Sequence, residues 1–178
     1  MQRRAFVTSG LTLSAGLAAG LTLPISLTGC SSEARKPGPL QQLPFNAWLT
    51  IGTDDSIAFL VDRSEMGQGV FTALPMLIAE ELGVDVARIK LEFAPADARF
   101  TNDLLGGQVT GGSTSIRDAW TKLRTAGARA REMLVAAACA EWGIPTTGCR
   151  VEDGVIVSSH GKRLRYGEVA AAAAKLPV

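Results

Sequence analysis

Hydrophobic positions predict a strand hairpin at the start of the regular structure. Residues 48–51 and 56–61 are short, mostly apolar runs rich in β-favouring side chains, which is typical of strands. The polar residues 53–55 between them have the composition of a tight turn. We therefore expect two neighbouring strands joined by a hairpin turn.

The spacing of apolar residues becomes helical after the second strand. Residues 70–82 carry apolar side chains three and four positions apart, which predicts a helix with one buried face. Gly83 follows at a position where a helix commonly ends. Apolar and polar residues then alternate over 88–93, which predicts a half-exposed strand, and the long segment 94–112 is expected to be a loop.

A second, longer helix is expected over residues 113–142. Its candidate N-caps are Ser113, Thr114 and Ser115. The positions expected to face inward include Ile116, Trp120, Leu123, Met133, Leu134 and Ala137. Residues 149–166 alternate like short strands, and residues 168–176 are expected to close as a helix. These elements together predict an α/β fold in which two main helices are layered on a mixed sheet.

Glycine-rich turns stand where the chain enters the two main helices. Gly67, Gln68 and Gly69 precede the first helix, and the glycines of residues 106–112 precede the second. Glycine leaves the backbone accessible, and the unpaired N–H groups of a helix start can hold an anion, so the two turns suggest one ligand held between two helix starts. Glycines at such sites also commonly serve the turn alone, and this alternative stays open. Gln68 and Gln108 add amides suited to a polar ligand.

Composition and charge argue against several classes of function. The 178 residues include 18 basic and 17 acidic side chains, and the net charge of +1 gives no global attraction to nucleic acid. His160 is the only histidine, so Ser-His-Asp catalysis and histidine metal sites are unsupported. Thr72 stands where a dinucleotide-binding fingerprint would have its third glycine, so a Rossmann site is not expected.

Two sets of residues in the second half of the chain leave alternatives open. Arg117, Arg124 and Arg131 recur at every seventh position and share a helix face, which is solvated or faces another subunit. Only Arg117 is near enough to the glycine turn to reach a phosphate. Cys139 and Cys149 fit no zinc spacing, and they either form a disulfide across the bend between them or stay buried and inert.

The N-terminus has the layout of an export signal. Arg3 and Arg4 precede a mildly apolar stretch, as in twin-arginine signals. That stretch ends in Leu-Thr-Gly before Cys30, which resembles a lipoprotein cleavage site with Cys30 as the lipidated residue. An uncleaved anchor helix is the alternative. We expect residues 1–29 to be the signal, so that the protein is exported to the periplasmic side of the cell envelope and tethered to the membrane through its signal or lipid.

Domain boundaries follow from composition. Residues 30–44 are rich in proline, glycine and polar side chains, which predicts a flexible linker. Residues 45–178 remain for a domain, and a chain of this size can bury a core of its own.

Five motifs together resemble one known family. They are residues 46–52, 63–69, 74–82, 94–97 and 106–115. In order and spacing they are similar to the molybdenum-binding large subunit of the xanthine dehydrogenase and aldehyde oxidase family, and within it to the isoquinoline 1-oxidoreductase beta branch. The resemblance covers nearly everything from about residue 46 to residue 175. It implies that the signal segment is followed by the N-terminal portion of a molybdopterin-binding domain.

The resemblance implies a molybdenum cofactor held largely by backbone groups of the two turns. The matching positions are Gly67, Gln68, Gly69, Gly111, Gly112, Ser113 and Thr114, with Gln108 as a weaker addition. The cofactor would be a molybdopterin in a dinucleotide form. Its own sulfurs hold the metal in this family, so no protein metal ligand is expected. The family also implies a small iron–sulfur partner subunit, which carries the iron–sulfur clusters, and a chain of electron acceptors.

The implied activity is hydroxylation of N-heterocycles or aldehydes with oxygen derived from water. The catalytic glutamate of the family has no match here, and Glu65 corresponds to a position without a base role. Glu80 and Glu81 are expected to face solvent or a neighbouring group. Full members of the family are several times longer, so we expect a truncated domain with no catalytic residue and no turnover by the chain alone. The alternative is a non-catalytic lipoprotein that retains a remnant of the cofactor-binding fold.

Overall fold

A computed structural model describes residues 41–177 of the chain. The expected signal over residues 1–29 and the expected lipidation site Cys30 lie outside the described residues. Within the described part, no helix is both long enough and apolar enough to cross a membrane.

The first sheet has four strands in the order β1-β2-β3-β4. Their bounds are β1 (Gln42–Pro44), β2 (Leu49–Gly52), β3 (Ile57–Val61) and β4 (Ile89–Phe93). The strands β1, β2 and β3 pair antiparallel, and β3 and β4 pair parallel, so the sheet is mixed as predicted. The hairpin between β2 and β3 is also confirmed, and Asp55 takes a positive φ of 68° in its turn.

Strand β1 begins earlier than the sequence analysis expected. It lies in the stretch assigned to the linker, where Leu43 pairs with Ile51 of β2. Pro44 lacks an N–H, but it lies on the outermost strand of the sheet, where the ladder tolerates that loss. The regular structure therefore starts at Gln42 rather than after residue 44.

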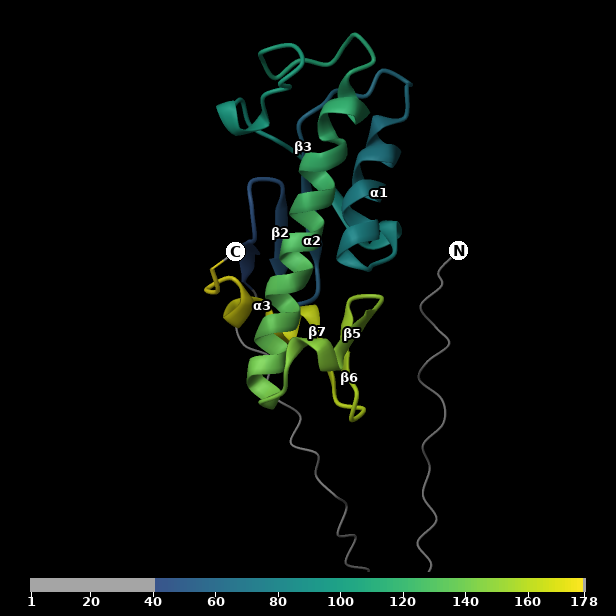
Figure 1. Ribbon diagram of the computed structural model, residues 1–178. Helices are drawn as coiled ribbons and strands as arrows, with labels where there is room; N and C mark the ends of the chain where they lie inside the picture. The colour runs from purple at the N-terminus through teal and green to yellow at the C-terminus, as the bar shows by residue number, and fades with distance from the viewer. Residues whose placement is uncertain (1–40, 178) are drawn as a thin grey trace, which may run out of the picture. The chain divides into compact units, whose positions relative to one another are not determined.

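Two helices pack side by side against this sheet (Figure 1). Helix α1 (Val70–Leu82) follows β3 and ends at Gly83, as predicted. The 3-10 turn η1 (Val86–Arg88) then leads into β4, so α1 is the crossover between the two parallel strands. Helix α2 (Ser115–Trp142) approaches α1 closely at Gly127, where an added Cβ would lie 2.7 Å from the backbone oxygen of Ile78. A side chain at this position would push the helices apart.

Helix α2 begins two residues later than expected. Ser113 has a positive φ of 53° and so belongs to the preceding turn. Thr114 occupies the N-cap position but makes no side-chain cap, because its hydroxyl donates to the oxygen of Gly111 at 2.7 Å. The predicted inward position of Trp120 is wrong, since its side chain is 51% exposed. Leu123 and Leu134, by contrast, are fully buried as predicted.

A second, antiparallel sheet and a short helix complete the fold. The strands are β5 (Cys149–Glu152), β6 (Val155–Ser158) and β7 (Arg163–Arg165), preceded by η3 (Thr146–Gly148) and followed by α3 (Tyr166–Ala173). The short strands were predicted, whereas their separation into a sheet of their own was not. Helix α3 starts earlier than predicted, at Tyr166, where Glu168 accepts a hydrogen bond from the N–H of Arg165 at 2.8 Å. Tyr166 is fully buried, and its hydroxyl donates to the oxygen of Leu82 at 2.5 Å.

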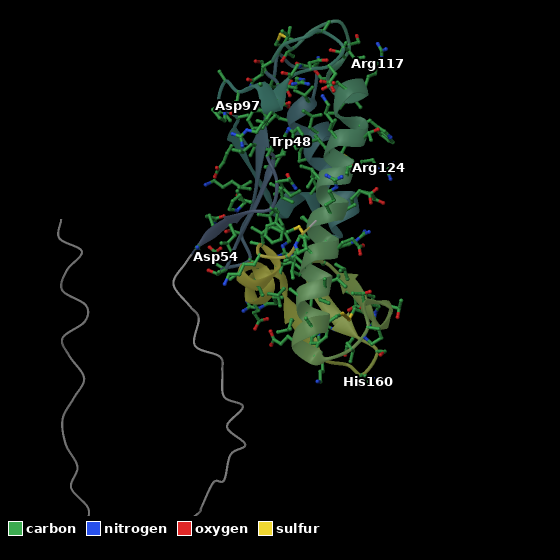
Figure 2. The ribbon with its side chains drawn as sticks, turned by 60° about the vertical axis from the view of Figure 1, so that its left-hand side comes forward. Trp48, Asp54, Asp97, Arg117, Arg124 and His160 are labelled. Carbon is green, nitrogen blue, oxygen red and sulfur yellow. A yellow bond between two sulfur atoms is a disulfide. The ribbon has the colours of Figure 1, made fainter. Side chains whose placement is uncertain are left out.

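The long helix α2 runs along the domain formed by the described residues (Figure 1). Figure 2 shows Arg117, near the start of α2, at the opposite end from His160 in the turn between β6 and β7. The loops that carry the glycine turns lie at the Arg117 end (Figure 1). The small sheet and α3 therefore support the far end of α2, away from these turns.

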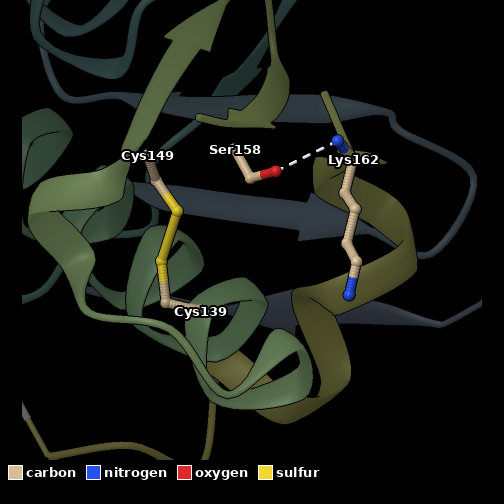
Figure 3. The surroundings of a disulfide bond; sticks show 4 residues. All are labelled: Cys139, Cys149, Ser158 and Lys162. Carbon is tan, nitrogen blue, oxygen red and sulfur yellow. Dashed lines mark hydrogen bonds between the residues drawn. A yellow bond between two sulfur atoms is a disulfide. The ribbon is translucent and has the colours of Figure 1, made fainter. Parts of the chain in front are cut away.

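Cys139 and Cys149 are joined by a disulfide (Figure 3). Cys139 lies on the buried side of α2, and Cys149 begins β5 after the bend that follows Gly143. The bond ties the end of α2 to the second sheet. Of the two alternatives left open by the sequence, pairing is the one found.

We expect the oxidised chain to lose about 2–4 kcal/mol of unfolding free energy when this disulfide is reduced, since reduction frees the ends of a loop in the unfolded chain. Urea unfolding with and without dithiothreitol measures the difference. The control is a Cys139→Ala/Cys149→Ala variant, whose stability should not respond to the reductant. Free thiols at both positions in unreduced, exported protein would contradict the prediction.

Candidate functional site

The two glycine turns meet at one end of the domain. The first follows β3 and opens α1, and the second lies in the loop between β4 and α2. The backbone N–H of Ser64 in the first loop donates to the hydroxyl oxygen of Thr110 in the second at 2.9 Å. Residues 46 positions apart in the sequence are thus bonded directly, and the two loops lie side by side.

A buried arginine fixes the first loop at its base. Arg63 lies two positions after the end of β3, and its side chain is fully buried. Its Nη2 donates to Asp118 Oδ2 of α2 at 2.7 Å, and its Nη1 donates to Asp62 Oδ2 at 2.8 Å. The sequence analysis missed Arg63 and Asp118 as site-forming residues. A charged residue at the end of a buried strand is the signal that could have identified the first of them.

Asp118 also holds the second loop in place. Its Oδ1 accepts hydrogen bonds from the backbone N–H of Asp103 and from Lys122 Nζ, each at 2.8 Å. Lys122 additionally donates to the oxygen of Thr101 and forms an ion pair with Asp103. Burial lowers the pKa of Lys122, but its hydrogen bonds to Asp103 and Asp118 outweigh this and raise the pKa above its usual value. One carboxylate thus connects β3, α2 and the loop between residues 94 and 114.

Asn102 organises the tip of the second loop. It is fully buried and pairs with Gly107 in an isolated bridge. Its Nδ2 donates to Thr114 Oγ1 at 2.7 Å, and Thr114 in turn donates to the oxygen of Gly111. The side chain of Thr114, a predicted cofactor contact, is therefore buried and committed to the loop, and its backbone N–H and oxygen are bonded within the chain as well, to Gly111 and Asp118.

The start of α1 is already occupied by a carboxylate of this chain. Glu65 accepts hydrogen bonds from the backbone N–H groups of Gly67 at 2.8 Å, Gly69 at 2.9 Å and Phe71 at 3.0 Å. These bonds, that from Phe71 first, lower the pKa of Glu65 below its usual value and keep it ionised. The expectation that the first turn offers these N–H groups to an anion is wrong, because Glu65 satisfies them internally.

Both glutamine amides also have partners in the chain. Gln68 Nε2 donates to the oxygen of Ser64 at 2.8 Å, and its Oε1 accepts from the N–H of Met66 at 2.5 Å. Gln108 Oε1 accepts from the N–H of Asp97 at 3.3 Å. Gln68 therefore shapes the first turn, and both amides retain hydrogen-bonding capacity for a ligand.

The start of α2 differs from that of α1 because it is open. No described residue accepts a hydrogen bond from the N–H groups of Gly112 and Ser113, and the first N–H groups of a helix have no partner within it. A Cβ placed on Gly111 would find no atom within 4 Å. The same holds over Gly67 and Gly69, both with positive φ. A ligand can therefore approach the backbone at both turns, and just before α2 it would meet the N–H groups of Gly112 and Ser113, for which no acceptor is found among the described residues.

A hollow of about 630 Å³ lies between the two loops. Its walls include three exposed apolar side chains, Met66, Phe93 and Val109, together with the polar residues Gln108 and Thr110. Asp62 and Arg63 also line it. The walls of the hollow thus combine apolar side chains with polar and charged groups, both of which a small-molecule site uses.

Two polar atoms beside the hollow are buried without partners among residues 41–177. They are Asp62 Oδ1 and Arg63 Nε. Burial raises the pKa of Asp62 above its usual value, against the lowering effect of Arg63. Within the same range no group of three His, Cys, Asp or Glu side chains is placed to hold a metal ion.

Comparisons with known proteins agree with this geometry. The molybdopterin cofactor-binding domain family matches residues 9–178 of the chain. The chain is 30% identical over 175 residues to isoquinoline 1-oxidoreductase subunit beta of Brevundimonas diminuta, covering 96% of this chain and 22% of the relative. It is 31% identical over 172 residues to a protein of Gluconacetobacter polyoxogenes named membrane-bound aldehyde dehydrogenase (pyrroloquinoline-quinone), covering 96% of this chain and 21% of the relative.

A solved structure shows the same fold. Quinoline 2-oxidoreductase from Pseudomonas putida 86 superposes with a TM-score of 0.55 at 20% identity, over 72% of this chain and 16% of that chain. The chain thus spans 22% and 21% of the length of the two curated relatives it matches. The family expected from the sequence motifs is confirmed.

We expect Arg63→Met to cost about 3–5 kcal/mol of unfolding free energy, because it leaves the buried carboxylate of Asp62 without a cation and that of Asp118 with Lys122 alone. Urea unfolding measures the loss. The control is Arg150→Met, which removes an exposed ion pair to Glu152 and should change the stability far less. Equal effects of the two substitutions would show that the buried pair does not support the loops.

Proposed function

The chain belongs to the family of molybdopterin cofactor-binding domains, and from this premise we propose that it forms part of the cofactor site in a molybdenum hydroxylase large subunit. The activity proposed for the whole subunit is hydroxylation of N-heterocycles or aldehydes with oxygen from water. The observation that carries the proposal is the direct bond between Ser64 and Thr110, which joins the two loops that carry the glycine turns beside a hollow. A backbone surface of this kind suits a cofactor that is held largely by main-chain groups.

The residues present fit such a cofactor. Space lies open above Gly67, Gly69 and Gly111, where any Cβ would stand between the backbone and a ligand. We propose that Gly67, Gln68 and Gly69 contact it from one side. On the other side we propose Gly111, Gly112 and Ser113, with Gln108 at the edge of the hollow, while Thr114 holds this turn in shape through its bonds to Gly111 and Asn102.

The two turns take different parts in this proposal. Glu65 places a negative charge at the start of α1, which disfavours a phosphate there. The start of α2 has open N–H groups and the positive end of a helix dipole, which favour one. We therefore propose that the phosphate groups of a dinucleotide form of the cofactor lie at the second turn, and that the first turn contacts an uncharged portion.

The chemistry is divided between the cofactor and the protein. When bound, the molybdenum cofactor supplies oxygen transfer to the substrate and accepts its electrons. The residues of this chain bind and orient it and keep one side of it from water. Glu65 is unsuited to act as a base because its oxygens are held by three backbone N–H groups. We propose that the catalytic base belongs to a segment outside this chain, and that the chain alone shows no turnover.

Partner subunits are part of the same proposal. A relative at 30% identity is named as subunit beta of its enzyme, which supports an assembly of more than one chain. We propose a small iron–sulfur subunit that carries the clusters, and an acceptor chain beyond it. The non-catalytic remnant is the second candidate, and no contact in the described residues favours it.

Export to the periplasmic side of the envelope is proposed from the N-terminal residues. Arg3 and Arg4 begin a twin-arginine signal, and Cys30 is the lipidated first residue of the mature chain. Twin-arginine export moves folded proteins, which suits a cofactor that is inserted before transport. The lipid at Cys30 would attach the domain to the membrane.

We expect Gly111→Ala and Gly111→Val, made in a full-length subunit, to lower molybdenum content progressively, with an approximately tenfold loss of affinity for valine. The new side chain enters space in which no protein atom lies within 4 Å, so the fold should survive. Metal analysis and the melting temperature are measured together. Gln68→Ala should have a milder effect and weaken cofactor binding by about 1 kcal/mol, because it leaves the backbone surface of the turn in place.

The matched control is Gly148→Ala at the far end of α2, where the new Cβ meets Ser159 at an ordinary distance of 3.5 Å. It should keep full molybdenum content. Full occupancy in the Gly111→Val subunit would contradict the cofactor assignment. So would the absence of molybdenum from the unaltered subunit, which would favour the non-catalytic alternative.

A separate test addresses export. Replacing Arg3 and Arg4 by lysine should leave the precursor in the cytoplasm, because the twin-arginine pathway requires the pair. Mass spectrometry of the exported protein should find a chain that starts at lipidated Cys30, and Cys30→Ala should remove the lipid. Normal export of the double-lysine variant, or an intact Met1 on exported protein, would refute the signal assignment.

A further inference from the structure

The charge of Glu81, near the end of α1, is neutralised by arginines of α2. Arg124 Nε donates to Glu81 Oε1 at 2.8 Å, and Arg131 Nη1 donates to the backbone oxygen of Glu81 at 2.7 Å. The expectation of a solvated or subunit-facing arginine stripe is therefore wrong for these two residues. The acidic residue at the opposite end of the same helix, Glu65, has no such partner.

Glu65 keeps its negative charge at the start of α1. Its carboxylate accepts hydrogen bonds from the backbone N–H groups of Gly67, Gly69 and Phe71, and no lysine or arginine within residues 41–177 forms an ion pair with it. A helix start attracts an anion because the dipole is positive there. The chain thus supplies that anion itself, and the first turn carries a charge that no cation balances.

The other groups of the first turn add to the exclusion of anions. The N–H of Met66 donates to Gln68 Oε1 at 2.5 Å, and the N–H of Ser64 donates to Thr110 Oγ1 at 2.9 Å. The backbone oxygens of residues 65–68, in contrast, accept no hydrogen bond from the part of the chain that the structure describes. The turn therefore presents mainly acceptor oxygens, whose partial negative charges repel a phosphate.

We infer that Glu65 is a positioning residue that closes the start of α1 to anionic groups and so orients the ligand. A phosphate is repelled at the first turn, whereas the N–H groups of Gly112 and Ser113 lack an acceptor among the described residues and can receive it. A ligand that spans the two turns then has one favoured orientation. The inference rests on the proposed function, because it assumes such a ligand.

The test uses the whole chain, inorganic phosphate as the probe, and the backbone N–H signals in NMR spectra as the readout. Glu65→Ala frees the N–H groups of Gly67, Gly69 and Phe71. Phosphate should therefore shift these three signals, with an affinity about tenfold or more above that of the unaltered chain at this turn. Glu65→Gln keeps an acceptor oxygen and removes the charge, so it should admit phosphate more weakly than Glu65→Ala. A merely structural role of Glu65 would create no such site.

The matched control is Asp85→Ala, which removes the same charge elsewhere. Asp85 caps the 3-10 turn η1 by accepting the N–H of Ala87 at 2.8 Å. This variant should bind phosphate like the unaltered chain, and an equal gain in it would overturn the inference. So would the absence of new phosphate shifts at the first turn in both Glu65 variants. If Glu65→Ala does not fold, as circular dichroism would show, Glu65→Gln decides alone.

Molybdenum content of a full-length subunit separates this inference from the proposed function. Glu65→Ala should lower the content about tenfold, because phosphate groups can then occupy either turn, whereas Asp85→Ala should keep it. Unchanged molybdenum in Glu65→Ala would overturn the orienting role and leave the proposed function standing. An unaltered subunit without molybdenum would instead refute the proposed function, and the phosphate titration would still decide whether Glu65 excludes anions.

Discussion

The buried ion pair between Arg63 and Asp118 is the constraint on which the functional end of this domain depends. Charges removed from water must be matched closely by partners, because an uncompensated buried charge costs several kcal/mol. Arg63 lies just beyond β3, and Asp118 lies in the first turn of α2, so their 2.7 Å contact fixes the sheet against the helix. The other oxygen of Asp118 holds the loop that carries the second glycine turn. The contact between Arg63 and Asp118, neither of which is a glycine, thereby positions the backbone of both glycine turns.

The two helix starts solve the same physical problem in opposite ways. Every helix leaves its first N–H groups without internal partners, and these need acceptors from elsewhere. At α1 the acceptor is Glu65, so the first turn is complete within the chain. At α2 the N-cap threonine is turned inward to the loop, and no side chain takes its place. The two helix starts differ because the loop before α1 directs Glu65 toward its helix, whereas the loop before α2 turns Thr114 away. The glycine content of the two loops does not show this difference.

Local pattern predicted local structure well and tertiary pairing poorly. Helix α1 and its end at Gly83 follow from periodicity and a left-handed glycine, both of which are local properties. Strand pairing of β1 and the separate second sheet depend on contacts between distant segments, which periodicity does not contain. The pairing of Arg63 with Asp118, 55 positions apart, is of the same kind. Trp120 has helical spacing with the core residues, but Arg124 offers its ring a partner at the surface.

A rigid polar base and an exposed apolar rim together explain why this end of the domain suits a large ligand. Beneath the hollow, Arg63 forms ion pairs with Asp62 and Asp118, and these pairs leave the three side chains little freedom to move when a ligand binds. Around it, Met66 and Phe93 are 70% and 76% exposed, which is unfavourable unless something covers them. Loop motion is restrained because Ser64 and Thr110 bond the loops together. A ligand that enters the hollow gains apolar contact at a small cost in conformational entropy, because the two loops that line it are already held together.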